Sequence, residues 1–142
     1  MYPGSGSVNL ALYNNEIIFG VTAHIINKEI DSGEIIDILE FPIEKSENVN
    51  SLLTKTHENL YLLFKNTVEG IVDVGDIFIK NKIDINEANW SGVANKIKFI
   101  DNLQKIDPGI TEEELERVIK SIHTKRFPIF IEIYGNRFEL KD

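Results

Sequence analysis

Apolar and polar positions alternate with a two-residue period near the N-terminus and follow a helical period further on. In 20–26, apolar side chains recur at every second position, which predicts a buried strand. A second apolar run predicts a strand over 34–44 that runs outward to Pro42. Between them, Asp31-Ser32-Gly33 is a turn signal, because Asp can bond its own backbone and Gly tolerates a positive φ. We therefore expect a strand, a curled loop and a second strand.

A long amphipathic helix is predicted over 48–71, where apolar residues recur at steps of three and four. Ser46 is a possible N-cap, and Gly70 or Gly75 marks the region where the helix ends. We expect one face of this helix to pack across the sheet and close the core. The residues of that face are Val49, Leu52, Leu53, Leu60, Leu63, Phe64, Val68 and Ile71.

The next stretch has a weaker pattern. Residues 76–85 are mixed and are interpreted as a possible strand, and 86–99 as a connector around the core. The connector contains Trp90, which is a packing anchor or, as the sharper alternative, a platform on which a sugar or base stacks. Residues 100–104 are predicted to form a helical turn.

A helix and a hairpin end the chain. Thr111 and Glu114 have the spacing of a capping box, which predicts a helix that begins here and runs to about Ile122. Alternating residues on either side of Tyr134-Gly135-Asn136 predict a β-hairpin over 127–140. A lone hairpin is marginal in water, so this one must pack on its own chain or on another.

The composition of the chain mainly excludes certain classes of protein and of partner. With 142 residues, 42% apolar and 27% charged, the chain is typical of one soluble globular domain. No apolar run approaches the roughly 20 residues that span a bilayer. The absence of cysteine excludes disulfides and thiolate metal sites, and we expect a cytoplasmic protein. A net charge of −8 argues against a nucleic-acid partner.

Candidate chemistry centres on the curled loop. His24 and Asp31 flank it, and both side chain types can move protons. Each has a plainer interpretation: Asp31 as a turn residue, and His24 as a hydrogen-bonded structural histidine on a strand. The three histidines, His24, His57 and His123, are too scattered to predict a metal site, and His57 is expected at the edge of the helix's apolar stripe. Asn9 could offer an amide to a substrate or cap a helical turn over 9–15.

Three segments in order carry a family resemblance: YPGSG at 2–6, NLALYN at 9–14 and GVTAHIINKEIDSGEII at 20–36. Together they resemble the 10-formyltetrahydrofolate-dependent formyltransferases, and most of all the sugar N-formyltransferases. The resemblance implies an α/β fold: the C-terminal half of a Rossmann-like formyltransferase domain with a long packing helix, followed by a helix and a β-hairpin. It divides the chain into a catalytic portion over 1–80, a connector over 81–110 and a dimerisation element over 111–142.

The same resemblance implies the site. Asp31 aligns with a member of the catalytic triad, and His24 is its auxiliary. The loop Asn27, Lys28, Glu29 and Ile30 would line the pocket of the co-substrate, 10-formyltetrahydrofolate. Tyr2, Gly4 and Asn9 would contact the acceptor, a nucleotide-linked amino sugar of the kind used in lipopolysaccharide biosynthesis. A homodimer through the hairpin is also implied.

One departure from the family limits this interpretation. The family carries an N-x-H-x-S-x-x-P motif shortly before YPG, and its Asn and His complete the triad. That motif does not occur in these residues, which begin at Met1. We expect the missing groups to come from a preceding segment, from a second polypeptide, or not at all. The competing hypotheses are therefore part of a formyltransferase and a non-catalytic remnant that dimerises or binds a small molecule; glycinamide ribonucleotide is a further possible acceptor, and a tRNA acceptor is disfavoured by the charge.

Overall fold

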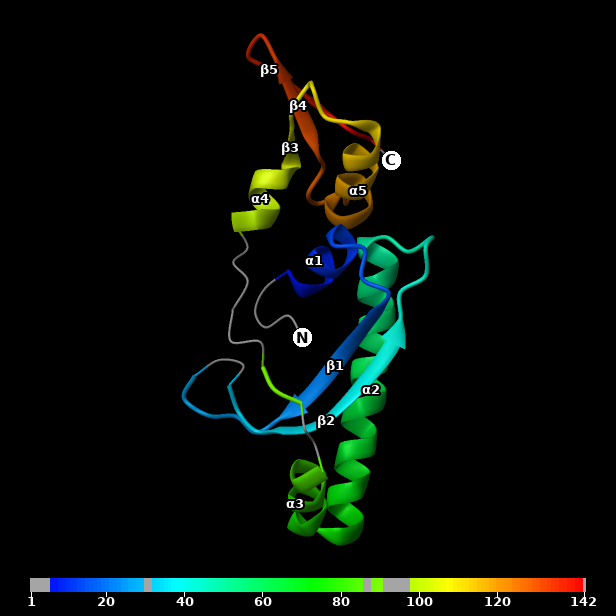
Figure 1. The fold of residues 1–142 in the computed structure, drawn as a ribbon, viewed down its shortest axis with the longest axis vertical. Helices are drawn as coiled ribbons and strands as arrows, with labels where there is room; N and C mark the ends of the chain where they lie inside the picture. Colours follow the sequence, from blue (N-terminus) through cyan, green and yellow to red (C-terminus); the bar gives the residue numbers. More distant parts are fainter. Residues whose placement is uncertain (1–5, 30–31, 86–87, 91–97, 142) are drawn as a thin grey trace.

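Two antiparallel strands against a long helix form the first part of the fold (Figure 1). The computed structural model describes residues 6–29, 32–85, 88–90 and 98–141. The α/β class, the long helix, the later helix and the C-terminal hairpin predicted from the sequence are all confirmed. The elements of the first part are α1 (Ser7–Tyr13), β1 (Ile18–His24), β2 (Ile35–Pro42), α2 (Val49–Val74) and α3 (Asp76–Ile85).

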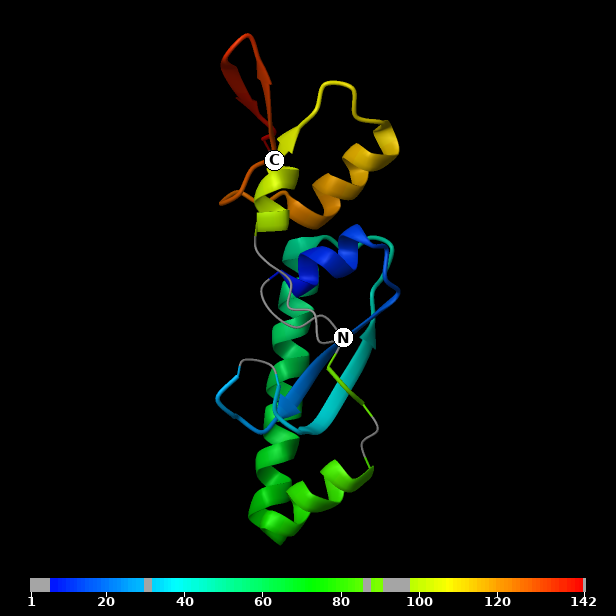
Figure 2. The ribbon, with the colours of Figure 1, turned by 60° about the vertical axis from the view of Figure 1, so that its left-hand side comes forward.

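The second part stacks on the N-terminal end of α2 (Figures 1 and 2). A short strand precedes its main helix and pairs in parallel with the first strand of the hairpin, an arrangement the sequence pattern does not predict. The hairpin turns at Tyr134-Gly135, where both residues have positive φ, 50° and 78°; this left-handed pair is the geometry of tight hairpin turns. The elements are α4 (Lys98–Gln104), β3 (Lys105–Ile106), α5 (Glu112–Ile122), β4 (Phe130–Ile133) and β5 (Asn136–Glu139).

The strands β1 and β2 pair antiparallel in a register that opposes Val21 to Leu39 and Phe19 to Phe41. Opposed residues in a ladder point to the same face, and all four of these side chains lie in the first hydrophobic cluster under α2. Within the described residues the sheet has only these two strands. Its apolar face is therefore narrow.

The ends of α2 are fixed by local side-chain chemistry. The prediction of Ser46 as N-cap is wrong: Asn48 is the cap, and its side-chain oxygen accepts from the N–H groups of Asn50 and Ser51. Ser51 Oγ accepts in return from the Asn48 N–H, which completes a capping box. The helix passes through Gly70 and ends at Val74, with Gly75 as C-cap at φ 69°. Among the described residues, no helix combines the length and apolarity needed to cross a bilayer.

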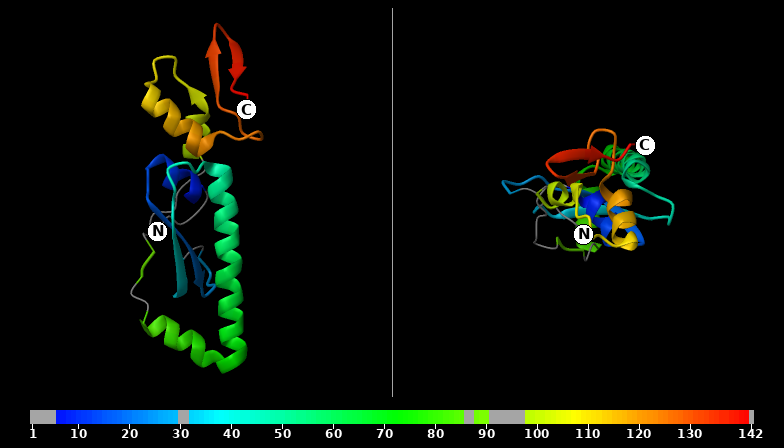
Figure 3. Two further views of the ribbon diagram at one scale, coloured as in Figure 1. Left: turned by 90° about the vertical axis from the view of Figure 1, so that its right-hand side faces the viewer. Right: turned by 90° about the horizontal axis from the view of Figure 1, so that it is seen from above.

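Much of the apolar face of α2 does not close a core. Val49, Leu52 and Leu63 are buried as expected, but Phe64 is 63% exposed. Figure 3 shows why: the helix is longer than the two strands beside it and continues beyond them to α3. The expectation that the whole stripe packs on the sheet is therefore wrong for the members that remain exposed, namely Leu53, Leu60, Phe64 and Val68.

The segment 76–85 is a helix, α3, and its interpretation as a strand is wrong. After the turn at Gly75, α3 folds back on α2. A Cβ added to Gly70 would lie only 2.3 Å from the nearest atom of the Phe78 ring, so the ring packs directly on this glycine. Lys82 Nζ lies 2.6 Å from Asp37 Oδ2 on β2, so α3 is also tied to the sheet. Tertiary contacts of this kind override a weak local pattern.

The first helix, α1, joins the two parts. Leu12 and its neighbour Ala11 are fully buried in the first cluster, whereas Tyr13 packs on the second cluster around Val118 and Ile122 of α5. The Tyr13 hydroxyl donates to the Glu114 carboxylate at 2.6 Å. Glu114 therefore serves the link between helices, while the cap of α5 is the Thr111 hydroxyl, which accepts from the Glu114 N–H.

Asn9 also links α1 to α5. Its amide nitrogen donates to the carbonyl oxygen of Ser121 at 2.7 Å, one of the last carbonyls of α5, which have no partner within the helix. The interpretation of Asn9 as the cap of its own helix is wrong, because the N-cap of α1 is Gly6 with φ 80°. Asn9 instead satisfies the end of a different helix.

Replacing Tyr13 with Phe tests the link between α1 and α5. We expect Tyr13→Phe to lower the free energy of unfolding at neutral pH by about 1–2 kcal/mol, because the hydrogen bond to a carboxylate is lost. The hydrogen bond to Glu114 raises the pKa of Tyr13 above its ordinary value. The stabilisation is therefore complete below pH 10 and disappears as the pH rises through the raised pKa, since a phenolate cannot donate.

Urea unfolding followed by circular dichroism at pH 7 and pH 11 measures this difference. The matched control is Tyr134→Phe at the exposed hairpin turn, where no effect is expected. An equal loss at both pH values would contradict the assigned role of the phenol proton.

Candidate active site

A β-bulge shapes the corner where β1 meets the curled loop. The register between β1 and β2 shifts between Ala23 and His24, so that Ala23 faces Asp37 while His24 faces Ile35. Beyond it, the Ile25 N–H still donates to the Glu34 carbonyl at 2.9 Å. A bulge bends a strand and redirects the side chain at that point. The loop therefore begins at a residue whose side chain is turned out of the regular ladder.

The His24 ring is held on two sides. Its Nδ1 donates to the backbone carbonyl of Ile25 at 2.9 Å, because a carbonyl oxygen can only accept. In the neutral ring this leaves Nε2 as the acceptor. The ring also meets Trp90 edge to face, with centroids 5.0 Å apart and planes at 89°. The histidine is thus fixed in orientation and tautomer at the mouth of the loop, which suits both the auxiliary and the structural interpretation.

Gly33 is required where the loop re-enters β2. A Cβ at this position would lie 1.6 Å from the carbonyl oxygen of Ile25 and 3.3 Å from Nδ1 of His24. The Gly33 carbonyl accepts a hydrogen bond from Nε1 of Trp90 at 2.8 Å. Trp90 therefore anchors both His24 and Gly33, which supports the packing interpretation of this residue.

The loop itself is closed by polar contacts of its own. The Asn27 side-chain oxygen accepts from the Glu29 N–H at 3.0 Å and from the Ser32 hydroxyl at 2.6 Å. Asn27, Lys28 and Glu29 are exposed, so this part of the loop presents itself to solvent. Ile30 and Asp31 lie outside the described residues. The folate-lining role of the loop and the catalytic role of Asp31 stay predictions.

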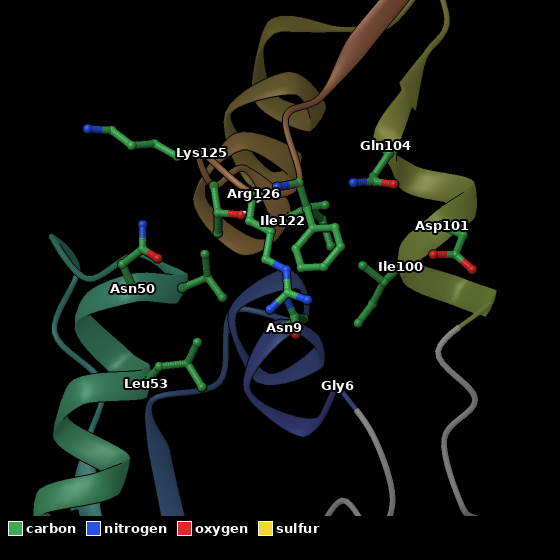
Figure 4. Close-up of a pocket in the computed structure, with 13 residues that line it drawn as sticks. Gly6, Asn9, Asn50, Leu53, Ile100, Asp101, Gln104, Ile122, Lys125 and Arg126 are labelled. Atoms are coloured by element: carbon green, nitrogen blue, oxygen red, sulfur yellow. Dashed lines mark hydrogen bonds between the residues drawn. The ribbon is translucent and has the colours of Figure 1, made fainter. Parts of the chain in front are cut away.

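Of the predicted acceptor residues, only Asn9 is described by the structure, and it lies away from this corner. Tyr2 and Gly4 lie outside the described residues. Asn9 lies on α1, before β1 begins, whereas His24 is the last residue of β1, a strand of seven residues. A strand of this length spans about 20 Å. Asn9 instead lines a cavity with α2, α4 and the segment after α5 (Figure 4).

The described residues hold no group of three or more His, Cys, Asp or Glu side chains arranged to bind a metal ion. His57 is exposed on α2. Sequence reasoning missed the cavity of Figure 4, because its residues come from segments far apart in the chain. The adjacent Arg126 and Phe127 are not a specific signal within the sequence, since a cation also lies over an aromatic ring at four other places among the described residues.

Comparison with known proteins places the chain among formyltransferases. No protein-family model matches it. It is 29% identical over 124 residues to the methionyl-tRNA formyltransferase of Flavobacterium johnsoniae, covering 85% of this chain and 36% of that protein. It is 30% identical over 120 residues to the bifunctional polymyxin resistance protein ArnA of Wigglesworthia glossinidia brevipalpis, covering 76% of this chain and 18% of that protein.

A solved structure is similar over almost the whole chain. The N-formyltransferase from Helicobacter canadensis, in complex with folinic acid and dTDP-3-aminofucose, is 26% identical, with a TM-score of 0.69 over 94% of this chain and 47% of that one. The resemblance to the formyltransferase family is thus confirmed, as is the fold as part of a formyltransferase domain. The chain spans less than half the length of each of these proteins.

Replacing Gly33 with Ala tests the construction of the corner. We expect Gly33→Ala to lower the free energy of unfolding by roughly 1–3 kcal/mol, because the new methyl group overlaps the Ile25 carbonyl and the backbone must shift. The indole fluorescence of Trp90, the only tryptophan, should change as well. Chemical unfolding and the emission spectrum give both values.

The matched control is Gly20→Ala on β1. A Cβ there meets its nearest neighbours at 3.4 Å, an ordinary contact, so stability should stay the same or rise slightly because alanine has less backbone freedom to lose. Equal stability of the two variants would contradict the close approach at Gly33.

Proposed function

We propose that this chain is the C-terminal part of an enzyme that transfers a formyl group from 10-formyltetrahydrofolate to the amine of a nucleotide-linked amino sugar. The observation that carries the proposal is the corner at His24 and Gly33, which lies in the GVTAH…DSG segment that resembles the family. The similarity to an N-formyltransferase crystallised with folinic acid and an amino-sugar nucleotide supports the same substrate pair.

The reaction needs three things from the protein. The attacking amine must lose a proton as its nitrogen bonds to the formyl carbon. The oxyanion that forms on that carbon needs hydrogen-bond donors. The departing folate nitrogen must receive a proton when its bond to carbon breaks. A carboxylate at Asp31 can accept the first proton and return one. The free ring nitrogen of His24, Nε2, is an acceptor in the neutral ring, so His24 can bond the Asp31 carboxyl group once that group carries the proton. The oxyanion donor would come from groups outside these residues.

The acceptor is the finer part of the proposal. The similarity to methionyl-tRNA formyltransferases leaves a tRNA acceptor as the rival. Against it stands the net charge of −8, because binding of a polyanion depends on clustered Lys and Arg. The similarity to a polymyxin resistance protein and to a sugar N-formyltransferase favours the amino sugar. The division at 80 and 110, the cytoplasmic location and the homodimer belong to the same proposal.

Replacing Asp31 with Asn tests the catalytic role. In the complete enzyme, assayed with 10-formyltetrahydrofolate and a nucleotide-linked amino sugar, Asp31→Asn should lower kcat by roughly 10²–10⁴-fold, since an amide cannot accept the amine proton. The matched control is Asp73→Asn on the exposed end of α2, which should leave kcat unchanged. Near-normal turnover of Asp31→Asn would remove this residue from the mechanism.

The alternative is a non-catalytic remnant that associates with other chains. Exposed apolar side chains along α2, called here the α2 stripe, favour this alternative. Tyr61, Phe64 and Val72 are 70%, 63% and 77% exposed, and exposed apolar surfaces of this kind mark interaction sites. The two-stranded sheet adds unpaired strand edges among the described residues, which invite further pairing. A titration with folinic acid separates the two functions, because a remnant devoted to association binds none.

Sedimentation of the 142-residue chain tests the association. We expect a species heavier than the 16.2 kDa monomer at micromolar concentration, and Phe64→Glu should shift it toward the monomer, because a buried unpaired carboxylate is costly in an interface. Phe138→Glu on β5 makes the same change on the hairpin. If only the hairpin variant dissociates, the interface is the predicted dimer element and the α2 stripe is left without this role. A wild-type monomer would contradict both.

A further inference from the structure

Trp90 reaches the corner at His24 and Gly33 from a distant part of the chain. It stands 57 residues after Gly33 and follows α3, outside the segment 20–36 that carries part of the family resemblance. In Figure 1 the short trace of 88–90 passes the end of β1, where His24 lies. The indole is half-buried at this place. The formyl-transfer proposal assigns no role to this residue.

The indole and a backbone carbonyl together fix the His24 ring. The two rings meet edge to face, with centroids 5.0 Å apart and planes at 89°, so the indole restricts the plane in which the imidazole lies. A half turn about the Cβ–Cγ bond leaves that plane unchanged but exchanges Nδ1 with a carbon atom. The Ile25 carbonyl removes this ambiguity, because it accepts from Nδ1 at 2.9 Å. Each contact therefore specifies what the other leaves open.

The same indole also holds the far end of the curled loop. Its Nε1 donates to the Gly33 carbonyl at 2.8 Å. Gly33 is buried, and a buried carbonyl without a partner costs free energy, so this hydrogen bond stabilises the backbone where the loop ends. His24 comes before the loop and Gly33 after it, and Asp31 precedes Gly33 by two residues in the sequence. One side chain thus contacts both ends of the loop that carries the proposed carboxylate.

The position of Trp90 is supported by α3. Lys82 Nζ on this helix lies 2.6 Å from Asp37 Oδ2 on β2, and Asp37 faces Ala23, the residue directly before the shift in register. The stretch from Lys82 to Trp90 is therefore tied to the β1–β2 pair at both of its ends. Trp90 is placed by the docking of α3 as well as by its own contacts.

We propose that Trp90 is a positioning residue for formyl transfer: it keeps the His24 ring in the tautomer with the proton on Nδ1, and it fixes the end of the loop at Gly33. The consequence for turnover rests on the proposed function, whereas the hold on the ring does not. Trp90 acts through these two residues and supplies no group to the reaction. The rival role is the stacking platform for a sugar or base, in which the indole would bind a substrate directly.

The tautomer of His24 matters for the proton that Asp31 takes from the amine. With the ring proton on Nδ1, Nε2 is an acceptor and can bond the Asp31 carboxyl group only in its protonated form. This bond favours the transfer of the amine proton to the carboxylate. A proton on Nε2 would instead be donated to the ionised carboxylate and would stabilise it, which opposes the same transfer. A ring that is free to exchange its tautomers therefore makes Asp31 a poorer base.

Nuclear magnetic resonance of the 142-residue chain, labelled with ¹⁵N at histidine, tests the hold on the ring. At pH 9 the wild-type His24 should carry its proton on Nδ1, whereas Trp90→Leu removes both contacts and should give a mixture of the two tautomers. Trp90→Phe keeps an aromatic ring beside His24 and should keep most of the proton on Nδ1. The exposed His57 on α2 is the internal reference. A wild-type proton on Nε2, or a tautomer ratio that Trp90→Leu leaves unchanged, would overturn the proposal.

Turnover of the complete enzyme tests the consequence. With 10-formyltetrahydrofolate and a nucleotide-linked amino sugar, Trp90→Leu should lower kcat roughly 10- to 100-fold, because a small displacement of a reacting group is costly. KM for both substrates should stay within about twofold, because a positioning residue binds neither of them. Trp90→Phe should recover a large part of the lost kcat. A raised KM with unchanged kcat would overturn the proposal in favour of the stacking platform.

The matched control is Phe78→Leu on α3. Phe78 belongs to the same part of the chain and packs on Gly70 of α2, so its loss should lower stability but leave the His24 tautomer and kcat unchanged. Equal effects of Trp90→Leu and Phe78→Leu on kcat would reduce the role of Trp90 to general packing and overturn the proposal.

Circular dichroism establishes that each variant is folded. If Trp90→Leu does not fold, the wild-type tautomer and the KM of Trp90→Phe still decide. Absence of formyl transfer by the wild-type enzyme would overturn the proposed function and the role in turnover with it. The hold of Trp90 on the His24 ring is then decided by the tautomer measurement alone.

Discussion

The contact between α1 and α5 is the interaction on which the two parts of this protein depend. The seven-residue helix α1 contributes to both hydrophobic clusters: Leu12 is fully buried in one, and Tyr13 packs on the other. A helix this short has little stability of its own. Its position is fixed instead by the Tyr13–Glu114 hydrogen bond and by Asn9, which satisfies the end of α5. The strand β1 starts only a few residues later, so the contact between α1 and α5 also fixes the position at which the sheet begins.

At the other end of β1, a bulge, a glycine and a tryptophan act together. The bulge turns His24 out of the ladder, and the Ile25 carbonyl then accepts from its ring while lying where a Gly33 side chain would be. Trp90 closes the arrangement by contacting the ring and the Gly33 carbonyl. The loop that carries the proposed catalytic carboxylate is therefore held at both of its ends, and this is the pre-organisation that proton transfer requires.

The apolar surface of the long helix α2 is only partly covered among the described residues. A helix of 26 residues runs beside two strands of seven and eight residues, so a large part of its apolar surface has nothing to cover it among the described residues. A protein whose relatives are at least twice as long is expected to bury such a surface against the rest of an enzyme or against another chain. The same physical feature thus underlies the proposed enzyme and its alternative.

The sequence by itself determined the elements whose cause is local. The period of the apolar residues predicted both strands, α2, α5 and the hairpin. Thr111 was found as a cap, and Gly75 was one of two candidates for the end of α2, because caps depend on neighbouring backbone groups. It also led to the family resemblance. The N-cap of α2 was predicted two residues too early, at Ser46, because Asn48 is an equally good capping residue at almost the same place.

Only the tertiary structure decided which distant residues meet. The helical state of α3 depends on the contact of Phe78 with Gly70 and on the ion pair of Lys82 with Asp37. Trp90 donates a hydrogen bond to the carbonyl of Gly33, which lies 57 residues earlier in the chain. The cavity at Arg126 gathers side chains from four segments. Contacts of this kind leave no periodic trace, because each depends on the path of the whole chain and not on its neighbours in sequence.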